Sequence, residues 1–340
     1  DKKANGFRHF FDAYMSGAAL APVLAKQYGE DRKAYHLTAD YTWGWTQEES
    51  IKAATEALGW ETVETVKTPL AQTDFSSYIA PVLNSGADVL ILNHYGGNMV
   101  NSLTNAVQFG LREKQVNGRN FEIVVPLFSR LMARGAGENI KGILGSTNWH
   151  WSLSDEGSKA FVKSFGTKYG FPPSQAAHTC YVQTLLYADA VQRAGSFDPC
   201  AVVEALEGGD SSLPGISSPA NKGYLFDGLG NGQTLYRSAD HQCFKDVLVV
   251  RGKENPTSEF DLLEVVEVTP VGRSGTSPTT RCSRAARSAP ATRAPDLQGI
   301  GGARPAPPVI AAFPAPCAGN ARPSFDLEGF GSWTQSSFKS

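Results

Sequence analysis

A short aromatic stretch, Asp40-Tyr41-Thr42-Trp43-Gly44-Trp45, holds the residues best suited to contacting a small molecule. It follows an apolar run, 34–39, that predicts a buried strand. In open α/β sheets ligands bind beyond the carboxyl ends of the strands, and three aromatic rings in six residues are unusual for a solvated loop. We expect Tyr41 and Trp43 to form one wall of a ligand cleft, with core packing as the alternative for each ring.

Catalytic and metal-binding motifs do not occur in the sequence. No Gly-x-Gly-x-x-Gly follows a strand, and neither a P-loop nor a Gly-x-Ser-x-Gly elbow is found. The histidines at 94, 150, 178 and 241 lack metal-ligand spacing to acidic or cysteine partners. Asp40 could be a general base in another α/β fold, but a loop cap is the simpler explanation. We expect no enzymatic activity, no metal and no cofactor.

The bulk composition describes a globular chain. Its 340 residues suffice for two domains, and the net charge of −2 argues against binding nucleic acid through phosphates. No apolar run is long enough to span a bilayer. The sequence begins Asp1-Lys2-Lys3, without an initiator Met or an apolar signal segment. We therefore expect that a leader has been removed or that the sequence starts within a longer protein.

Five cysteines, at 180, 200, 243, 282 and 317, show no C-x-x-C spacing, so we expect neither a zinc site nor a dithiol site. Their odd number excludes complete pairing within the chain. A Cys180–Cys243 disulfide in an exported protein and free buried thiols both remain open.

Alternating apolar and amphipathic segments between residues 32 and 147 predict βαβ units and a mainly parallel sheet. A capping box at Thr46-Gln47-Glu48-Glu49 suggests a helix start there. The expected strands are 34–39, 62–67, 88–93, 122–126 and 142–147. The expected helices are 46–58, 74–84, 98–109 and 129–136, preceded by a strand remnant and a helix within 7–28.

The later part of the chain is organised differently. Three helices, 154–169, 174–194 and 198–207, follow one another without strands, so their apolar faces lack a visible partner surface. A loop at 208–223 precedes Asn231-Gly232, which predicts a hairpin turn, and 247–251 and 262–268 read as strands. Residues 269–340 are rich in Pro, Arg, Ala, Gly and Ser, which predicts disorder. A non-native continuation in another reading frame and a natural Pro-rich tail both remain open.

Several short stretches occur in an order typical of one family. They are Phe7-Arg8 followed by Gly17, Asp40-Tyr41-Thr42-Trp43-Gly44, Asp74-Phe75-Ser76, Ser85-Gly86-Ala87-Asp88-Val89-Leu90, Tyr169-Gly170 with Pro172-Pro173, Ala188-Asp189-Ala190-Val191, and Glu204-Ala205-Leu206-Glu207. No single stretch is diagnostic. Over roughly residues 7–268, their order resembles the type I periplasmic substrate-binding proteins of branched-chain amino acid and amide ABC transporters, the Leu/Ile/Val-binding protein-like family.

The resemblance implies two Rossmann-like α/β lobes with parallel sheets, joined by a hinge, and a ligand held between them. On that plan, residues 1–148 form the second lobe, 149–225 the helical remainder of the first lobe, and 226–268 the strands that return to the second lobe. The first half of the first lobe would be missing, so we expect an N-terminally truncated chain with an incomplete first lobe.

The resemblance also implies ligand contacts. Trp43 matches an aromatic that stacks on the ligand, and Tyr95 in Asn93-His94-Tyr95-Gly96-Gly97 matches a second contact. Phe128 stands where amino-acid-binding members often carry an acidic residue for the ligand ammonium. An unpaired cation in a closed cleft is costly, so this departure favours an uncharged, amide-like or aromatic ligand. Trp149, at a crossover between the lobes, either lines the cleft floor or packs the hinge.

The implied function is the solute-binding component of an ABC importer. The chain would capture a branched-chain amino acid, amide, urea-like molecule or aromatic acid by hinge closure and deliver it to a permease. The implied location is the periplasm, or a lipid-anchored position outside the cytoplasm, without insertion into the membrane. The ligand-sensing domain of a regulator or receptor with the same fold is the alternative, and an α/β enzyme with an unrecognised site is a third hypothesis.

Overall fold

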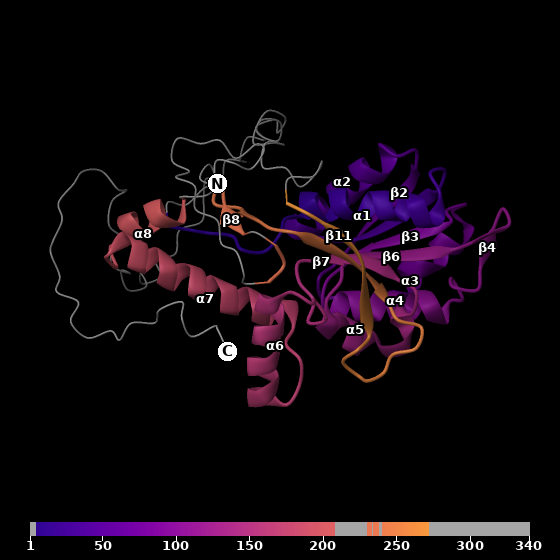
Figure 1. Cartoon of the computed structure of the whole chain (residues 1–340). Coiled ribbons are helices and arrows are strands. Elements are labelled where there is room, and N and C mark those ends of the chain that lie inside the picture. Colours follow the sequence, from indigo (N-terminus) through magenta and orange to yellow (C-terminus); the bar gives the residue numbers. More distant parts are fainter. Residues whose placement is uncertain (1–4, 208–229, 233, 238–239, 272–340) are drawn as a thin grey trace, which may run out of the picture.

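The computed structural model describes residues 5–207, 230–232, 234–237 and 240–271. At its centre is a seven-stranded sheet in the order β11-β10-β7-β6-β3-β1-β2 (Figure 1). Its strands are β1 (Lys33–Ala39), β2 (Glu61–Thr68), β3 (Val89–Asn93), β6 (Glu122–Leu127), β7 (Leu144–Thr147), β10 (Val247–Gly252) and β11 (Leu263–Thr269). The loop predicted at 208–223 and nearly all of the tail predicted at 269–340 lie outside the described residues.

Helices follow these strands in chain order, as the alternating pattern predicts. They are α1 (Ala13–Tyr28), α2 (Thr42–Glu56), α3 (Ser76–Ile79), the 3-10 helix η1 (Ala80–Asn84), α4 (Gly97–Gln108), α5 (Arg130–Ala136) and the 3-10 helix η2 (Gly137–Ile140). Strands β1, β2, β3, β6 and β7 pair in parallel, whereas β10 and β11 are antiparallel. The expected mainly parallel α/β sheet is confirmed. A short ribbon, β4 (Gln115–Val116) and β5 (Arg119–Asn120), projects from it.

Strands β3, β6 and β10 are buried on both faces of the sheet, which is why they read as nearly continuous apolar runs. Alternate residues of β3 enter two different cores. Leu90 and Leu92 pack with α3, α4 and α5, whereas Val89 and Ile91 pack with α1 and α2. The two cores position the carboxyl ends of β1, β3, β6 and β7 along one edge of the sheet.

Three further helices project away from the sheet (Figure 1): α6 (Glu156–Tyr169), α7 (Gln175–Ala194) and α8 (Pro199–Leu206). The expectation that their apolar faces find no partner in this chain is wrong in part. Val182 and Leu186 of α7 pack against Tyr236 and Cys243, which belong to a ribbon of β8 (Leu235–Tyr236) and β9 (Cys243–Phe244). These two-residue strands are too short to give a sequence pattern.

Two local predictions are wrong. Helix α2 begins at Thr42, after the extended residue Tyr41, and the Thr46 hydroxyl donates to the Trp43 carbonyl at 3.0 Å instead of capping the helix. The stretch predicted as an aromatic turn is therefore largely the first turn of α2. The hairpin β8–β9 pairs Leu235 with Phe244 and Tyr236 with Cys243. Asn231-Gly232, although both residues have positive φ, precedes the hairpin.

Gly44 allows α2 to start tightly against the end of β1. A Cβ atom at this position would lie 2.0 Å from the carbonyl oxygen of Ala39. Because backbone must move to relieve that clash, we expect Gly44→Ala to lower the free energy of unfolding by about 1–3 kcal/mol. Denaturant titration measures this change. The matched control is Gly166→Ala in α6, where a Cβ meets nothing within 4 Å; there we expect a gain of about 0.5–1 kcal/mol. Equal effects at both glycines would contradict the prediction.

Candidate functional site

The aromatic residues predicted to contact a ligand gather at the carboxyl edge of the sheet. The ring centroids of Tyr41 and Trp43 lie 6.0 Å apart, and those of Trp43 and Tyr95 lie 6.1 Å apart in an edge-on arrangement. Trp43 is half-buried and packs on a core cluster that includes Phe11 and Leu127. Tyr95 is 42% exposed. The structure thus brings together three of the five predicted contacts in one partly open aromatic cluster.

The ends of β1 and β3 hold this cluster in place. Asp40 continues the β1–β2 ladder by donating its amide to the Thr68 carbonyl at 2.8 Å, and α2 then begins at once and carries Trp43. Gly96 adopts a φ of +60° as α4 begins, a conformation that glycine reaches without strain. That turn leaves Tyr95 at the surface between β3 and α4.

Buried polar residues at the end of β3, directly before Tyr95, support the aromatic cluster. The Asn93 amide donates to the Thr38 hydroxyl at 3.1 Å. His94 lies within hydrogen-bond distance of the Thr68 hydroxyl, at 2.9 Å, and of the Ser102 hydroxyl, at 2.8 Å. Burial lowers the pKa of His94 to about 3, so the imidazole is neutral and gives and accepts one hydrogen bond each. This network ties together β2, β3 and α4.

Trp45, three residues from the start of α2, takes no part in the cluster. Its indole N–H donates to the Asp40 carboxylate at 2.9 Å, and the Lys67 ammonium lies 4.8 Å from its ring. The same Asp40 carboxylate lies 3.9 Å from the Lys67 ammonium. Asp40 therefore serves as a partner for Trp45 and Lys67 at the exposed side of this turn.

Trp149 and Phe128 occupy enclosed positions. The Trp149 ring stacks on His178 with a centroid distance of 4.4 Å and an interplanar angle of 3°, and its indole N–H donates to Ser158 at 2.9 Å. Phe128 is fully buried in the core beneath the sheet, close to Gly145. Both side chains pack against other protein groups. The ligand contacts expected of Phe128 and Trp149 stay predictions.

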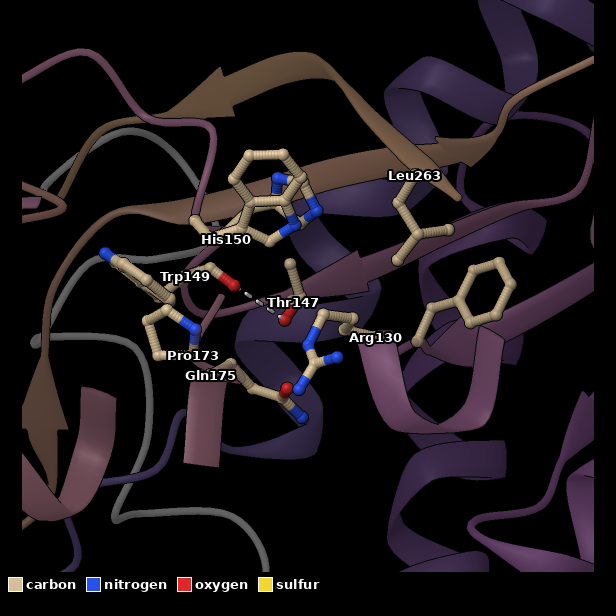
Figure 2. A pocket seen from close by; sticks show the side chains of 9 residues that line it. Arg130, Thr147, Trp149, His150, Pro173, Gln175 and Leu263 are labelled. Carbon is tan, nitrogen blue, oxygen red and sulfur yellow. Dashed lines mark hydrogen bonds between the residues drawn. The ribbon is translucent and has the colours of Figure 1, made fainter. Parts of the chain in front are cut away.

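Phe128 and Trp149 also line a hollow between the sheet and the helices that project from it (Figure 2). The residues that line it are Phe128, Arg130, Thr147, Trp149, His150, Trp151, Pro173, Gln175 and Leu263. Side chains fill this space in the present conformation and leave no room for a water molecule. Residues that follow β6 (Phe128 and Arg130) and residues at the end of β7 and just beyond it (Thr147 to Trp151) line the hollow.

Sequence reasoning missed the charged residue of this hollow, Arg130. It is 5% exposed, and its guanidinium lies beside the stacked rings of Phe171 and Phe260, at 5.9 Å and 5.5 Å from their centroids. Burial and the nearby Arg134 guanidinium lower the pKa of Arg130, and Glu259 acts in the opposite direction. The only signal in the sequence was its place two residues after Phe128, directly beyond a strand end.

The two cysteines that could have paired are both free. The Cys180–Cys243 disulfide is therefore not formed. Cys243 is a free buried thiol, as the alternative expectation had it, whereas Cys180 is a free thiol at the surface. Among the described residues, no three His, Cys, Asp or Glu side chains are grouped so that they could hold a metal ion. In the same part of the chain, no helix has the length and hydrophobicity needed to span a membrane.

The fold has many solved relatives. The chain superimposes on an amino acid ABC transporter substrate-binding protein from Pseudomonas fluorescens Pf-5 with a TM-score of 0.69 and 22% identity, covering 82% of this chain and 69% of that one. A periplasmic binding protein from Burkholderia mallei matches with a TM-score of 0.67 and 24% identity, over 81% and 67% of the two chains. An ABC transporter solute-binding protein from R. palustris, in complex with benzoate, matches with a TM-score of 0.63 and 19% identity. The match covers 78% of this chain and 66% of that one.

Sequence comparison gives the family. No curated protein sequence matches the chain. The sequence profile of the periplasmic binding protein family, however, matches residues 1–256, three quarters of the chain, and the mostly parallel sheet has the type I fold that the sequence resemblance implied. The chain belongs to the periplasmic binding protein family.

Proposed function

We propose that this chain is the solute-binding component of an ABC importer and binds a small molecule at the carboxyl edge of its sheet. The observation that carries the proposal is the aromatic cluster of Tyr41, Trp43 and Tyr95 beyond β1 and β3. Aromatic rings offer a ligand a large apolar surface at a small entropic cost. Burial raises the pKa of the Tyr41 hydroxyl, and Tyr95 adds to the rise, so Tyr41 stays neutral and can donate a hydrogen bond.

Residues on both sides of the crossover supply the contacts in this proposal. Tyr41, Trp43 and Tyr95 touch the ligand from the sheet, and Phe128 and Trp149 line the neighbouring hollow. We assign residues 1–148 and 226–268 to one lobe and 149–225 to the other. A ligand that contacts both lobes stabilises the closed arrangement. The closed form then presents the solute to a membrane permease outside the cytoplasm, and no chemical step is involved.

The ligand class follows from the residues at the site. Phe128 offers no charge to a ligand ammonium, whereas aromatic rings predominate beyond β1 and β3. One structural relative is in complex with benzoate, and another is an amino acid transporter component. We therefore place aromatic acids and amides ahead of free α-amino acids, and a ligand panel should include benzoate, benzamide, leucine, leucinamide and urea.

Replacement of Trp43 tests the proposal. We expect at least one member of the panel to bind the full chain, and Trp43→Ala to weaken that ligand at least 10-fold, about 1.4 kcal/mol, by isothermal titration calorimetry. Trp45→Ala is the matched control because Trp45 lies on the same helical turn but packs on Lys67 and Asp40. We expect that variant to bind within about 2-fold of the parent. If no member of the panel binds, or if Trp43→Ala binds with unchanged affinity, the proposed site is wrong.

A further inference from the structure

Arg130 is a buried cation that forms no ion pair with the residues that the structure describes. Its Nε and Nη1 atoms are buried and form no hydrogen bond within the described part of the chain. Glu259, the acidic group that acts on the pKa of Arg130, is held 2.6 Å from the Arg134 guanidinium. An ionised group that is buried without a countercharge costs several kcal/mol, and aromatic faces recover only about 1 kcal/mol each. The arrangement is explained if an anion enters the hollow and binds Arg130.

Other unpartnered polar atoms converge on the same hollow. His150 Nε2, Trp151 Nε1 and Gln175 Oε1 are also buried without a hydrogen-bond partner, and all three residues line the space with Arg130. Figure 2 shows the Arg130 guanidinium and the Gln175 amide pointing toward one another from α5 and α7. His150 and Gln175 are each 3% exposed. Four polar groups left unsatisfied in one place are unusual in a native protein.

The chemistry of these groups selects a carboxylate. Nε and Nη1 are donors on two different edges of the guanidinium, and each can give a carboxylate oxygen a charge-assisted hydrogen bond. The Trp151 indole is a donor only. The unpartnered atom of Gln175 is its acceptor oxygen, and exchanging the oxygen and nitrogen of the amide places the NH2 donor at that position. The 20-residue helix α7 begins at Gln175, and the amino-terminal end of its dipole adds a partial positive charge at this place. The acidic residue facing His150, Asp261, is neutralised by Lys253 at 2.6 Å.

We propose that the hollow around Arg130 is the subsite for a carboxylate group of the transported ligand, with Arg130 as the charged anchor and Trp151 and Gln175 as donors. The proposal rests on the proposed solute-binding function and narrows its ligand class to organic acids. Arg130 lies on α5, which packs on the sheet, and Gln175 lies on the projecting helix α7, so separation of the two parts would open the space. A carboxylate held by both residues would then draw them together again.

Paired ligands that differ only in charge test the carboxylate subsite. Benzoate and benzamide, and leucine and leucinamide, are titrated into the full chain by calorimetry. We expect the parent to bind the acid at least 10-fold more tightly than its amide in the pair that binds. Arg130→Gln should lower the affinity for the acid at least 10-fold and change the affinity for the amide less than about 3-fold. Arg251→Gln, which removes an exposed guanidinium paired with Glu264 at 2.6 Å, should change neither.

Thermal unfolding of the same variants excludes loss of folding as the cause. Arg130→Gln removes an unpaired buried charge, so its Tm should equal or exceed that of the parent. A parent that binds acid and amide equally, or a variant that loses both equally, would overturn the carboxylate subsite and leave the solute-binding function standing. A parent that binds no member of either pair nor of the larger panel would instead refute solute binding itself.

Discussion

The free energy of unfolding should fall by about 4 kcal/mol for each unit of acidification between about pH 6 and pH 5. All six histidines of the chain are buried, and burial is the main cause of lowered pKa values in His36 and His94, each to about 3, and in His9, to about 2. In the unfolded chain each imidazole takes up a proton near its ordinary pKa of about 6.5. Protons therefore bind the unfolded state preferentially.

The sign and the window follow from these pKa values. Above about pH 7.5 both states are neutral at these histidines, so they add no pH dependence. As the pH falls, the unfolded state gains about one proton at each of the three, worth about 1.4 kcal/mol per unit apiece. His150, with a pKa lowered to about 4 mainly by burial, adds to the loss over most of the window. The carboxyls of Asp12, Glu122 and Asp246, whose pKa values burial raises, oppose it at lower pH.

Urea titrations at half-unit steps of pH measure this slope. His94→Gln is the informative variant because Gln retains hydrogen-bonding capacity toward Thr68 and Ser102 but cannot take up a proton. Its slope should be smaller than that of the parent by about 1.4 kcal/mol per pH unit. A parent slope below about 1.5 kcal/mol per unit would show that the buried histidines ionise in the folded chain. Ligand binding is accordingly best measured above pH 7.

Much of the architecture could be predicted because it depends on local patterns. The strand at β3 reads Val-Leu-Ile-Leu-Asn, and a run that is apolar at every position predicts burial on both faces. The start of α2 was missed because Gly44 packs directly on the Ala39 carbonyl, a tertiary contact that allows the helix to begin without a side-chain cap. The ribbon β8–β9 was missed because strands of two residues give no sequence pattern, and the residues that pack it on α7 lie far away in the chain.

The site could be predicted only where strand ends determine it. Tyr41, Trp43 and Tyr95 follow β1 and β3, and neighbouring parallel strands bring their carboxyl ends together. Arg130 could not be found in this way, because an arginine near the start of a helix is usually solvated. Its burial depends on Phe171 and Phe260, which lie 41 and 130 residues further along the chain. Contacts at that separation leave no pattern in a single sequence.

Replacement of Arg32 by Met should lower the free energy of unfolding by about 3–5 kcal/mol. The Arg32 side chain is 3% exposed and lies at the amino ends of the strands, 3.3 Å from the Asp88 carboxylate and 3.9 Å from Glu122. It also donates to the Asn120 carbonyl at 3.0 Å. Without Arg32, the buried Asp88 carboxylate retains the Lys33 amide, at 2.7 Å, and a distant Arg119 guanidinium, at 3.8 Å. Most of the cost comes from that uncompensated charge.

The neighbouring residue provides the control. Lys33 follows Arg32 in the chain, but its ammonium pairs with Glu61 at 3.0 Å in an exposed position, so Lys33→Met should cost less than about 1 kcal/mol. Asp88→Asn in the Arg32→Met background should recover part of the loss, because the amide carries no charge to leave unpaired. Similar losses for Arg32→Met and Lys33→Met in denaturant titrations would contradict the argument.

The same variant separates stability from binding. Arg32 and Asp88 lie at the amino edge of the sheet, whereas Tyr41, Trp43 and Tyr95 lie beyond the carboxyl ends of β1 and β3. The folded fraction of Arg32→Met should therefore bind the panel ligand as tightly as the parent, although less of the chain is folded. Trp43→Ala should show the reverse emphasis: the folded chain binds more weakly, and the loss of stability is smaller than in Arg32→Met because Trp43 is only half-buried. If Arg32→Met lowered the intrinsic affinity, the two edges would have to be coupled through the strands that join them.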